Sequence, residues 1–323
     1  MNKQRSSIKK RILTLKEQRN ALILAHNYQP LEVQKIADRV GDSLQLARIA
    51  SDVNGHDMVI FAGVRFMAEM ASVLANDTPV YIPDPDATCP LASFCGAERV
   101  REAKEQHPDA PVVVYVNTTA ETKSECDVIC TSSNAVDIVE SLQTPIVLFG
   151  PDVNLARYAR TQTHTEIIDI APEGHCYVHQ EFNVEDIQRL REEYPEATVL
   201  VHPECPPDVQ DIADIVGSTG KMAEYVSQSD DKAFIIATEV GLVEQLRDDY
   251  PNKVIVAANE KAICKDMKKT SLEKILHILE ERPEENLVTV PVDMRDKVRL
   301  VLERMNRVGL EDSPISLLQH LTH

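Results

Sequence analysis

Short apolar runs alternate along this chain with segments whose hydrophobic residues recur at helical spacing. The runs rich in Val, Ile and Ala are Ala21–Ala25, Met58–Ala62, Val80–Ile82, Val112–Val116, Ile146–Phe149, Glu166–Ile170, Thr198–Val201, Ala233–Ala237 and Lys253–Ala257. Such runs between amphipathic segments are typical of strands in parallel βαβ order. The pattern therefore predicts an α/β protein in which helices cover both faces of small, three-stranded parallel sheets.

The intervening segments predict helices. Those within the first and third groups of strands are Leu31–Arg39, Ser43–Ser51, Arg65–Ala75, Pro207–Val216 and Gly220–Ser227, and those connecting groups are Ala97–Gln106, Val184–Glu193 and Ser271–Glu281. Asn183 and Thr270 or Ser271 are suitable N-caps for the last two. Further helices are expected at about residues 6–19 and 295–307, with a strand-like LVTVPV segment before the latter.

The same unit is repeated three times. The first strand of each unit ends at His26, Tyr115 and His202, a hydroxyl residue follows 17 positions later at Ser43, Ser132 and Thr219, and each unit closes with Cys89, Cys176 and Cys264. The cysteines are 87 and 88 residues apart. Internal repetition on this scale indicates repeated structural units. We expect three αβα domains, namely 1–108, with 285–323 packing on it, then 109–196 and 197–284.

Polar residues at the strand ends indicate where a site lies. Ligands of open α/β sheets bind outside the carboxyl ends of the strands. His26, Tyr28, Tyr115, His202 and Glu204 all suit proton transfer if they converge. Singly, each is equally a hydrogen-bonding residue at the end of a strand. Three domains whose carboxyl edges face one another would enclose a central active site.

Three equivalent thiols could bind a metal ion or an iron–sulfur cluster. A [4Fe–4S] cluster with three cysteine ligands leaves one iron open to act as a Lewis acid. Zinc is the inorganic competitor, because Cys176 and His179 form a C-x-x-H pair. His179 could instead donate a proton or lie in the core. The other cysteines lack equivalents at the repeat spacing and are read as small core residues: Cys95, Cys126, Cys130 and Cys205.

The hydroxyls of Ser43, Ser132 and Thr219 have two interpretations. Each lies where a loop enters a helix, so each could be an N-cap. A helix N-terminus can also bind a phosphate or carboxylate group of a substrate.

Composition limits the function classes. The net charge is −18 and aromatic residues make up 4%, which disfavours a nucleic-acid partner. Apolar runs stay well below the length of a membrane span, about 18–20 residues, and the N-terminus lacks an apolar signal region. We therefore expect a cytoplasmic protein with no membrane or nucleic-acid partner. Seven cysteines there indicate metal or thiol chemistry and not disulfides.

At these residues the chain closely resembles the quinolinate synthase family of NAD biosynthesis. The matching stretches are AHNYQ, GDS, FAGVRFMAE, YVNTTAETK, CTSSNAV, GHCYVH, HPECP and GSTGKM, spread over about residues 20–275. The resemblance implies condensation of iminoaspartate with dihydroxyacetone phosphate to quinolinate, with loss of phosphate and water. It also implies a [4Fe–4S] cluster and possible coupling to an aspartate oxidase or dehydrogenase.

The resemblance assigns roles to residues. The implied cluster ligands are Cys89, Cys176 and Cys264. The implied catalytic residues are Glu204, Tyr28, Tyr115 and His202. The implied substrate-binding residues are His26, Ser43, Asn117, Ser132, His179, Ser218 and Thr219. Some family members carry extra cysteines around the third ligand, whereas the segment here, AICKDM, has only Cys264.

Two other classes share the cysteine pattern. One is a three-domain iron–sulfur reductase or radical enzyme resembling the diphthamide-synthesis proteins. The other is a zinc-stabilised protein that binds a small molecule. The strand-end residues favour the synthase, because they can bind hydroxyl and carboxylate groups.

Overall fold

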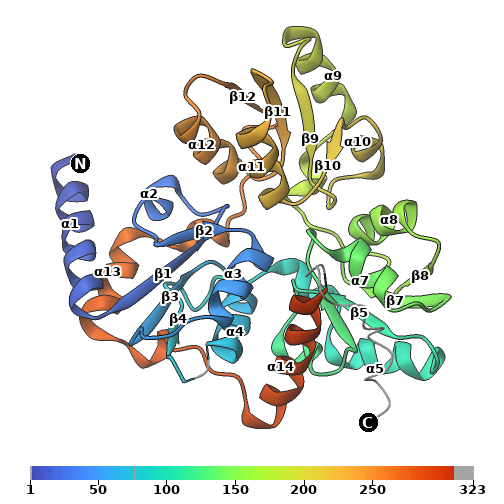
Figure 1. Ribbon diagram of the computed structural model, residues 1–323, viewed down its shortest axis with the longest axis horizontal. Coiled ribbons are helices and arrows are strands. Elements are labelled where there is room, and N and C mark those ends of the chain that lie inside the picture. The colour runs from blue at the N-terminus through green and yellow to red at the C-terminus, as the bar shows by residue number, and fades with distance from the viewer. Residues whose placement is uncertain (1, 76, 309–323) are drawn as a thin grey trace. The chain divides into compact units, whose positions relative to one another are not determined.

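Three parallel sheets with one common connectivity form the framework of the protein (Figure 1). The computed structural model describes residues 2–75 and 77–308. Each sheet has four strands, in the orders β2-β1-β3-β4, β6-β5-β7-β8 and β10-β9-β11-β12. The α/β class with three helix-flanked parallel sheets is thus confirmed.

The strands have the following bounds. The first sheet contains β1 (Ala21–His26), β2 (Arg39–Gly41), β3 (Met58–Ala62) and β4 (Val80–Tyr81). The second contains β5 (Val112–Tyr115), β6 (Val128–Cys130), β7 (Ile146–Gly150) and β8 (Glu166–Asp169). The third contains β9 (Thr198–Val201), β10 (Ile215–Val216), β11 (Ala233–Ala237) and β12 (Val254–Ala257). Central strands such as β3 are buried on both faces, which explains their continuous apolar sequences.

The prediction of three strands per sheet was wrong, because each sheet has a short extra strand, β2, β6 or β10. Two of the predicted helices, Leu31–Arg39 and Pro207–Val216, correspondingly end early, at Gln34 and Asp211. An aspartate just before each extra strand accepts the backbone N–H of a residue of the first strand of the sheet. The pairs are Asp38 with Ile23, Asp127 with Val112 and Asp214 with Val199, each at 2.8 Å. This hydrogen bond favours an extended backbone after the aspartate, where the spacing of the hydrophobic residues alone predicted that the helix continues.

Fourteen helices flank the sheets in the part of the chain that the structure describes. They are α1 (Asn2–Gln18), α2 (Leu31–Gln34), α3 (Ser43–Ser51), α4 (Arg65–Leu74), α5 (Ala97–Gln106), α6 (Ala120–Lys123), α7 (Ala135–Ser141), α8 (Val153–Gln162), α9 (Val184–Glu193), α10 (Pro207–Asp211), α11 (Thr219–Gln228), α12 (Val240–Asp249), α13 (Leu272–Glu281) and α14 (Val292–Arg307). Asn183 caps α9 and Ser271 caps α13, as predicted.

The chain divides into two compact units. The first comprises residues up to Cys89 together with Ile263–Pro291, and the second comprises Pro90–Ala262 together with α14. The first unit therefore contains the first sheet, and the second unit contains the other two.

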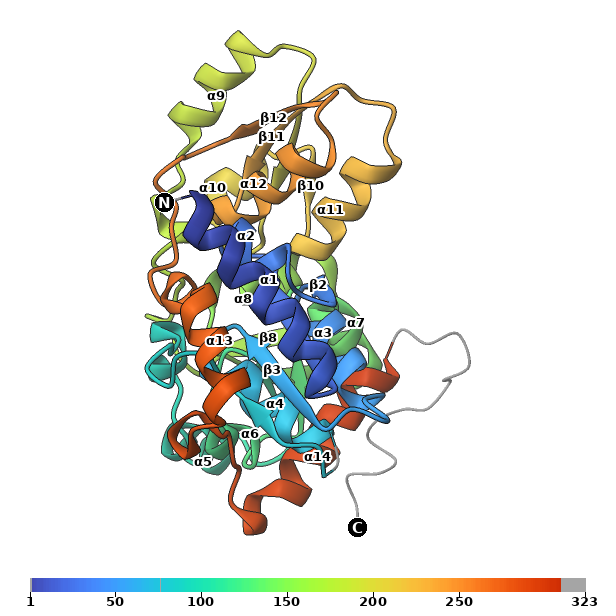
Figure 2. The ribbon, with the colours of Figure 1, turned by 90° about the vertical axis from the view of Figure 1, so that its left-hand side faces the viewer.

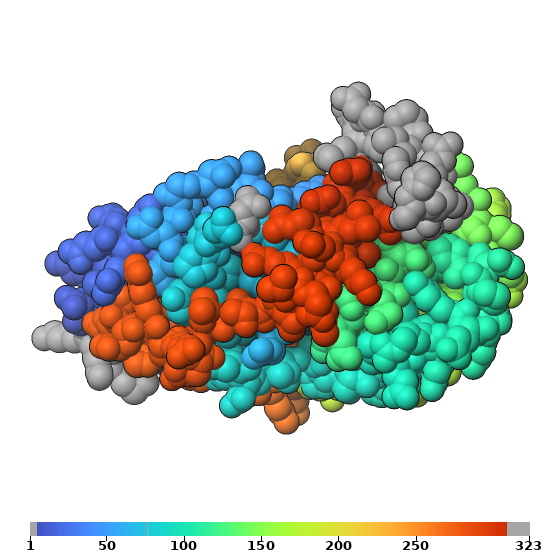
Figure 3. Space-filling view, turned by 90° about the horizontal axis from the view of Figure 1, so that it is seen from below, coloured from blue at the N-terminus to red at the C-terminus, as the bar shows by residue number. Residues whose placement is uncertain are grey.

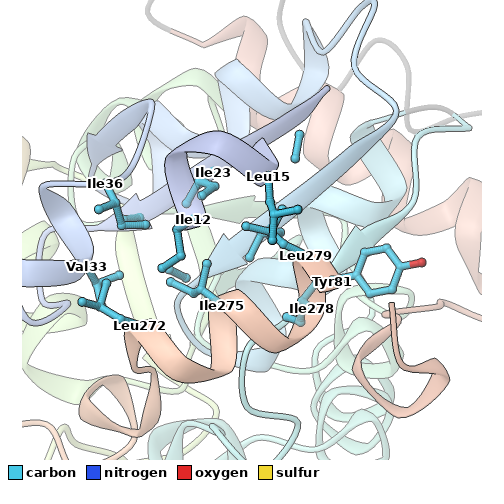
Figure 4. Packing of buried hydrophobic residues seen from close by; sticks show 14 of the residues in the cluster. Ile12, Leu15, Ile23, Val33, Ile36, Tyr81, Leu272, Ile275, Ile278 and Leu279 are labelled. Carbon is cyan, nitrogen blue, oxygen red and sulfur yellow. The ribbon is translucent and has the colours of Figure 1, made fainter. Parts of the chain in front are cut away.

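Helices α1 and α13 cover one face of the first sheet and lie side by side (Figure 2). Their apolar residues, including Ile12 and Ile275, pack with Ile23 and Ile60 of the sheet in one buried cluster (Figure 4). Each fully buried aliphatic side chain stabilises the fold by roughly 1.5–3 kcal/mol. Helix α1 thus shares a buried core with the first sheet.

The backbone of residues 286–288 contacts the first sheet. Val288 donates its backbone N–H to Val80 of β4, and Ile82 donates to Asn286. The segment makes a single antiparallel bridge there and not a strand. Helix α14 instead packs on β6 and α6 of the second sheet, and Arg304 donates to the carbonyl of Asp127. Figure 3 shows α14 in red against this teal and green surface; residues 309–323 lie outside the described part.

Among the described residues, none of the helices combines the length and the apolarity needed to span a bilayer.

Candidate active site

The three repeat cysteines follow the same main-chain anchor. In each repeat the first residue of the helix after the third strand donates its N–H to the carbonyl two residues before the cysteine. The pairs are Arg65 with Ala87 (2.7 Å), Val153 with Gly174 (2.9 Å) and Val240 with Ala262 (3.1 Å). The sequence repeat therefore reflects a repeated backbone contact that fixes where each cysteine loop begins.

The three cysteines at the repeat positions are also the three that differ from the others in solvent exposure. Cys89, Cys176 and Cys264 are half-buried, whereas the other four are buried. Burial raises the pKa of Cys95 to about 11 and that of Cys126 to about 12. It also raises the pKa of Cys130 and Cys205 above the ordinary value. A buried neutral thiol is a poor ligand and a poor nucleophile, so the core interpretation fits those four.

A buried side chain holds the loop after the first strand of each sheet. It lies eight residues after the strand-end residue and donates to the carbonyls of the first and third residues of the loop. Gln34 donates to Asn27 and Gln29, Lys123 to Val116 and Thr118, and Gln210 to Pro203 and Cys205. All three are at most 5% exposed. These anchors keep Tyr28, Asn117 and Glu204 in defined loops.

The strand-end histidines have a fixed tautomer. Nδ1 of His26 accepts the backbone N–H of Tyr28 at 3.1 Å, and Nδ1 of His202 accepts that of Glu204 at 3.3 Å. Because a backbone N–H can only donate, the ring proton of each neutral imidazole lies on Nε2. Both rings are buried.

In the first unit, the strand-end loop contacts the turn that follows Cys264. Lys268 donates its ammonium group to the carbonyl of Tyr28 at 2.5 Å, and the Gln29 side chain donates to the carbonyl of Met267 at 2.8 Å. The ring of Tyr28 lies edge-on to that of His26. The first unit thus links the loop that carries two predicted site residues to the turn that follows one predicted cluster ligand.

In the second unit, Glu204 is the centre of a buried polar cluster. Tyr115 donates its hydroxyl hydrogen to Oε1 of Glu204, and Nδ1 of His179 lies 2.8 Å from Oε2. Nε2 of His179 lies 3.0 Å from Oγ1 of Thr238. The rings of His179 and His202 are stacked. Predicted residues from the second and third repeats therefore converge here.

Two buried carboxyl groups in this cluster have opposite pKa shifts. Burial raises the pKa of Glu204, but the imidazoles of His179 and His202 and the hydrogen bonds from His179 and Tyr115 outweigh it, so this pKa lies well below its usual range. The pKa of Asp152 is well above its usual range because of burial and the charge of Glu204. The surroundings therefore favour the ionised form of Glu204 and the protonated form of Asp152. Divergent carboxyl groups of this kind are typical of acid–base sites.

Among the described residues of this unit, Cys176, His179 and Glu204 could together hold a metal ion, because their ligand atoms lie within 4.8 Å of one another. Both ring nitrogens of His179, however, already have partners in Glu204 and Thr238. Thiolates are preferred ligands of iron–sulfur clusters as well as zinc. Cys176 can therefore ligate a metal in this arrangement, whereas ligation by His179 would have to replace one of its two contacts.

The repeat hydroxyls are not the N-caps of their helices. Asp42 caps α3 and Ser218 caps α11, so Ser43 and Thr219 are the first helical residues. Ser132 lies in the turn before α7, where the N-cap position is Asn134. Ser218 accepts a hydrogen bond from Ser133 at 2.8 Å, which links the second and third repeats. The carboxyl edge of each sheet thus carries a strand-end residue and a hydroxyl, as predicted.

Sequence reasoning missed several residues that shape the site. Thr238 immediately follows the third strand of its repeat, and Asp152 lies two residues after its own, as Val64 does in the first repeat, but their side chains differ. The three loop anchors are Gln34, Lys123 and Gln210, which lie at the same distance after the strand-end residue but are not the same residue type. Only an alignment of the three repeats could therefore have identified them.

The three parallel sheets, with a buried acid–base cluster and half-buried cysteines at their carboxyl edges, define an α/β enzyme. A sequence profile described as "Quinolinate synthetase A protein" matches residues 10–307. The chain therefore belongs to the quinolinate synthetase A family.

Relatives across nearly the whole length agree with this assignment. The chain is 49% identical over 304 residues to the quinolinate synthase of Methanothermobacter thermautotrophicus, covering 94% of this chain and 99% of the relative. It is 48% identical over 298 residues to that of Pyrococcus furiosus, covering 92% and 97%. It is 47% identical over 294 residues to that of Thermotoga maritima, covering 91% and 97%.

Proposed function

We propose that this enzyme condenses iminoaspartate with dihydroxyacetone phosphate to form quinolinate. The atoms balance when one phosphate and two water molecules leave. The structural observation that supports the proposal is the ionised Glu204, which accepts hydrogen bonds from Tyr115 and His179 in a buried cluster. Such a reaction needs several proton transfers at carbon, nitrogen and oxygen, and a positioned carboxylate with two proton-bearing neighbours suits them.

We propose Cys89, Cys176 and Cys264 as the ligands of a [4Fe–4S] cluster. These three thiols fit the ligand set of such a cluster, because they are the three half-buried cysteines and each follows the same main-chain anchor. When bound, such a cluster with one open iron supplies a Lewis acid that polarises a substrate oxygen. The match to the synthase family favours this class over the reductase and zinc-protein alternatives.

Glu204 is proposed as the main proton acceptor. Its carboxylate is ionised at neutral pH, and the phenol of Tyr115 can return a proton along their shared hydrogen bond. His179 is held between Glu204 and Thr238 and stabilises the negative charge. Tyr28 and His202 are proposed as further proton-transfer groups, each placed by its strand-end loop.

The remaining polar residues are proposed to bind the anionic groups of the substrates. Ser43 and Thr219 lie in the first turns of α3 and α11, where backbone N–H groups and the helix dipole favour phosphate or carboxylate. The other proposed binding groups are His26, Asn117, Ser132, His179 and Ser218.

The compartment and the source of substrate follow from the same chemistry. The buried cysteines Cys95, Cys126, Cys130 and Cys205 are thiols, which suits a reducing cytoplasm. Iminoaspartate requires oxidation of an aspartate amine, so we expect an aspartate oxidase or dehydrogenase to supply it.

Anaerobic purification tests the proposal. The protein should be brown, contain about four iron and four sulfide per chain and form quinolinate from the two substrates. Cys176→Ala should lose iron, whereas the matched variant Cys205→Ala, which removes a buried thiol, should keep it. A colourless chain that contains stoichiometric zinc and makes no quinolinate would contradict the proposal.

A further inference from the structure

Asp266 connects the loops of two repeat cysteines within the first unit. Its Oδ1 accepts the backbone N–H of Thr88 at 3.3 Å. Thr88 immediately precedes Cys89, and Asp266 follows Cys264 by two residues. One carboxylate therefore joins two segments that are 178 residues apart in the chain.

Lys269 holds this carboxylate from the other side. Its Nζ donates to Oδ1 of Asp266 at 2.8 Å and to the carbonyl of Asp86 at 2.6 Å. The hydrogen bond to Asp266 raises the pKa of Lys269, so the amine is protonated. Asp86 belongs to the loop of Cys89, and the lysine thus makes a second link between the same two loops.

The backbone that carries Asp266 is itself fixed. Lys268 donates its N–H to the carbonyl of Cys264, and Lys269 donates to that of Asp266, both at 3.1 Å. The fully buried Gln29 donates to the carbonyl of the next residue, Met267. Asp266 is only 9% exposed, so little water competes for its contacts. A rigid turn holding a buried acceptor can set the position of the loop that donates to it.

We propose that Asp266 is a positioning residue that preorganises Cys89 and Cys264 as a pair of thiol ligands before any metal binds. The inference rests on the proposed function for the identity of the group that the thiols finally hold. The pairing of the two loops itself follows from contacts within the first unit.

Cadmium binding to the metal-free full-length chain tests this pairing. A Cys176→Ala background leaves Cys89 and Cys264 as the half-buried thiols, and Cd²⁺ bound to their thiolates absorbs in the ultraviolet. In this background, Asp266→Ala should weaken Cd²⁺ binding by about 10- to 100-fold, the usual effect of removing a residue that orients a ligand. Asp266→Asn keeps an acceptor oxygen for the Thr88 N–H and should recover most of the affinity.

Asp38→Asn is the matched control. Asp38 also accepts a backbone N–H and a lysine ammonium in the first unit, from Ile23 and Lys16, but it contacts neither cysteine loop. Its substitution should leave the Cd²⁺ affinity unchanged. Should Asp266→Ala prove unfolded by circular dichroism, Asp266→Ser, whose side chain is too short for the Thr88 N–H, replaces it. Folded Asp266→Ala or Asp266→Ser with the affinity of the parent chain would overturn the proposal.

This outcome is separate from that of the proposed function. A chain that binds Cd²⁺ in an Asp266-dependent manner but makes no quinolinate supports the positioning role and contradicts the synthase assignment. A chain that makes quinolinate, but whose Cd²⁺ affinity does not depend on Asp266, supports the synthase assignment and contradicts the positioning role.

Discussion

The imidazole of His179 stacks on that of His202, with ring centroids 4.4 Å apart and an interplanar angle of 18°. His179 lies three residues after Cys176 and His202 directly follows β9, so the stack joins the second and third repeats. Glu204 and Thr238 hold the ring of His179 in place. Since the ring of His202 stacks on this fixed ring, its orientation is fixed as well. The cluster is therefore preorganised, which is what general acid–base chemistry requires.

Substitution of Glu204 should abolish most of the activity. Glu204→Gln keeps the size of the side chain but removes the charge that accepts a proton. We expect kcat for quinolinate formation to fall by about 10²- to 10⁴-fold, measured anaerobically. Glu185→Gln, on the exposed side of α9, is the control and should leave kcat unchanged. A Glu204→Gln enzyme with normal kcat would remove Glu204 from the chemistry.

Alkylation should distinguish the two classes of cysteine. In the metal-free native chain, iodoacetamide should modify Cys89, Cys176 and Cys264 and spare the four buried thiols, as read by peptide mass spectrometry. Raising the pH to 10 should still spare Cys95, since its pKa of about 11 keeps the thiol neutral. All seven should react in denaturant. Rapid native modification of Cys95 would show that its surroundings open.

Cys126 should make the fold sensitive to alkali. Its pKa is about 12 in the folded chain because of burial, against an ordinary 9.0. Below pH 9 the thiol is neutral in both states, and stability is unaffected. Above pH 9 the unfolded chain loses the proton first, so stability falls by up to about 1.4 kcal/mol per pH unit until the folded thiol ionises.

Urea unfolding at pH 8 and pH 10 measures this effect. The free energy of unfolding of the native chain should decrease more between these values than that of Cys126→Ala. Equal decreases would mean that Cys126 ionises alike in both states.

The anchor of the Glu204 loop should contribute to stability. Gln210 donates to the carbonyls of Pro203, Cys205 and Asn154. Gln210→Ala leaves these buried acceptors without their donor and should lower the free energy of unfolding by about 1–3 kcal/mol. Gln228→Ala removes only an exposed contact with Glu224 and should change it little. Equal effects of the two substitutions would contradict the anchoring role.

The loop before Cys176 should not tolerate a methyl group at Gly174. A Cβ there would lie 2.0 Å from the carbonyl oxygen of Pro151, so the backbone must shift. Gly174→Ala should therefore destabilise the chain by at least about 2 kcal/mol, measured by thermal unfolding. Gly96→Ala is the control, since a Cβ at Gly96 meets nothing within 4 Å. Similar unfolding temperatures for both variants would show that the anchor is loose.

The sequence predicted best what depends on local pattern. The nine predicted strands alternate with helices, and β9 and β11 begin and end where the apolar runs do. The repeat spacing also identified the three half-buried cysteines among seven, because a position shared by three copies carries more information than any single thiol.

The sequence predicted poorly those features that depend on contacts between residues far apart in the chain. The short strand β10 is two residues long, too short for periodicity, and forms because β9 offers a partner. The capping role predicted for Ser43 belongs to Asp42, which reaches the N–H groups of Leu44 and Gln45. The apolar face of α14 showed that it needed a partner but not that the partner is the second sheet.

The anchors before the cysteines consist entirely of main-chain atoms, from Arg65 to Ala87, Val153 to Gly174 and Val240 to Ala262. Such a tether fixes the path of the chain without prescribing most of the side chains around it. The three repeats can therefore differ at their strand ends, where two carry histidine and one tyrosine, while each places a thiol at the same point of its own fold. Repetition of the backbone in this way supplies regular positions, and variation of the side chains supplies chemical diversity at them.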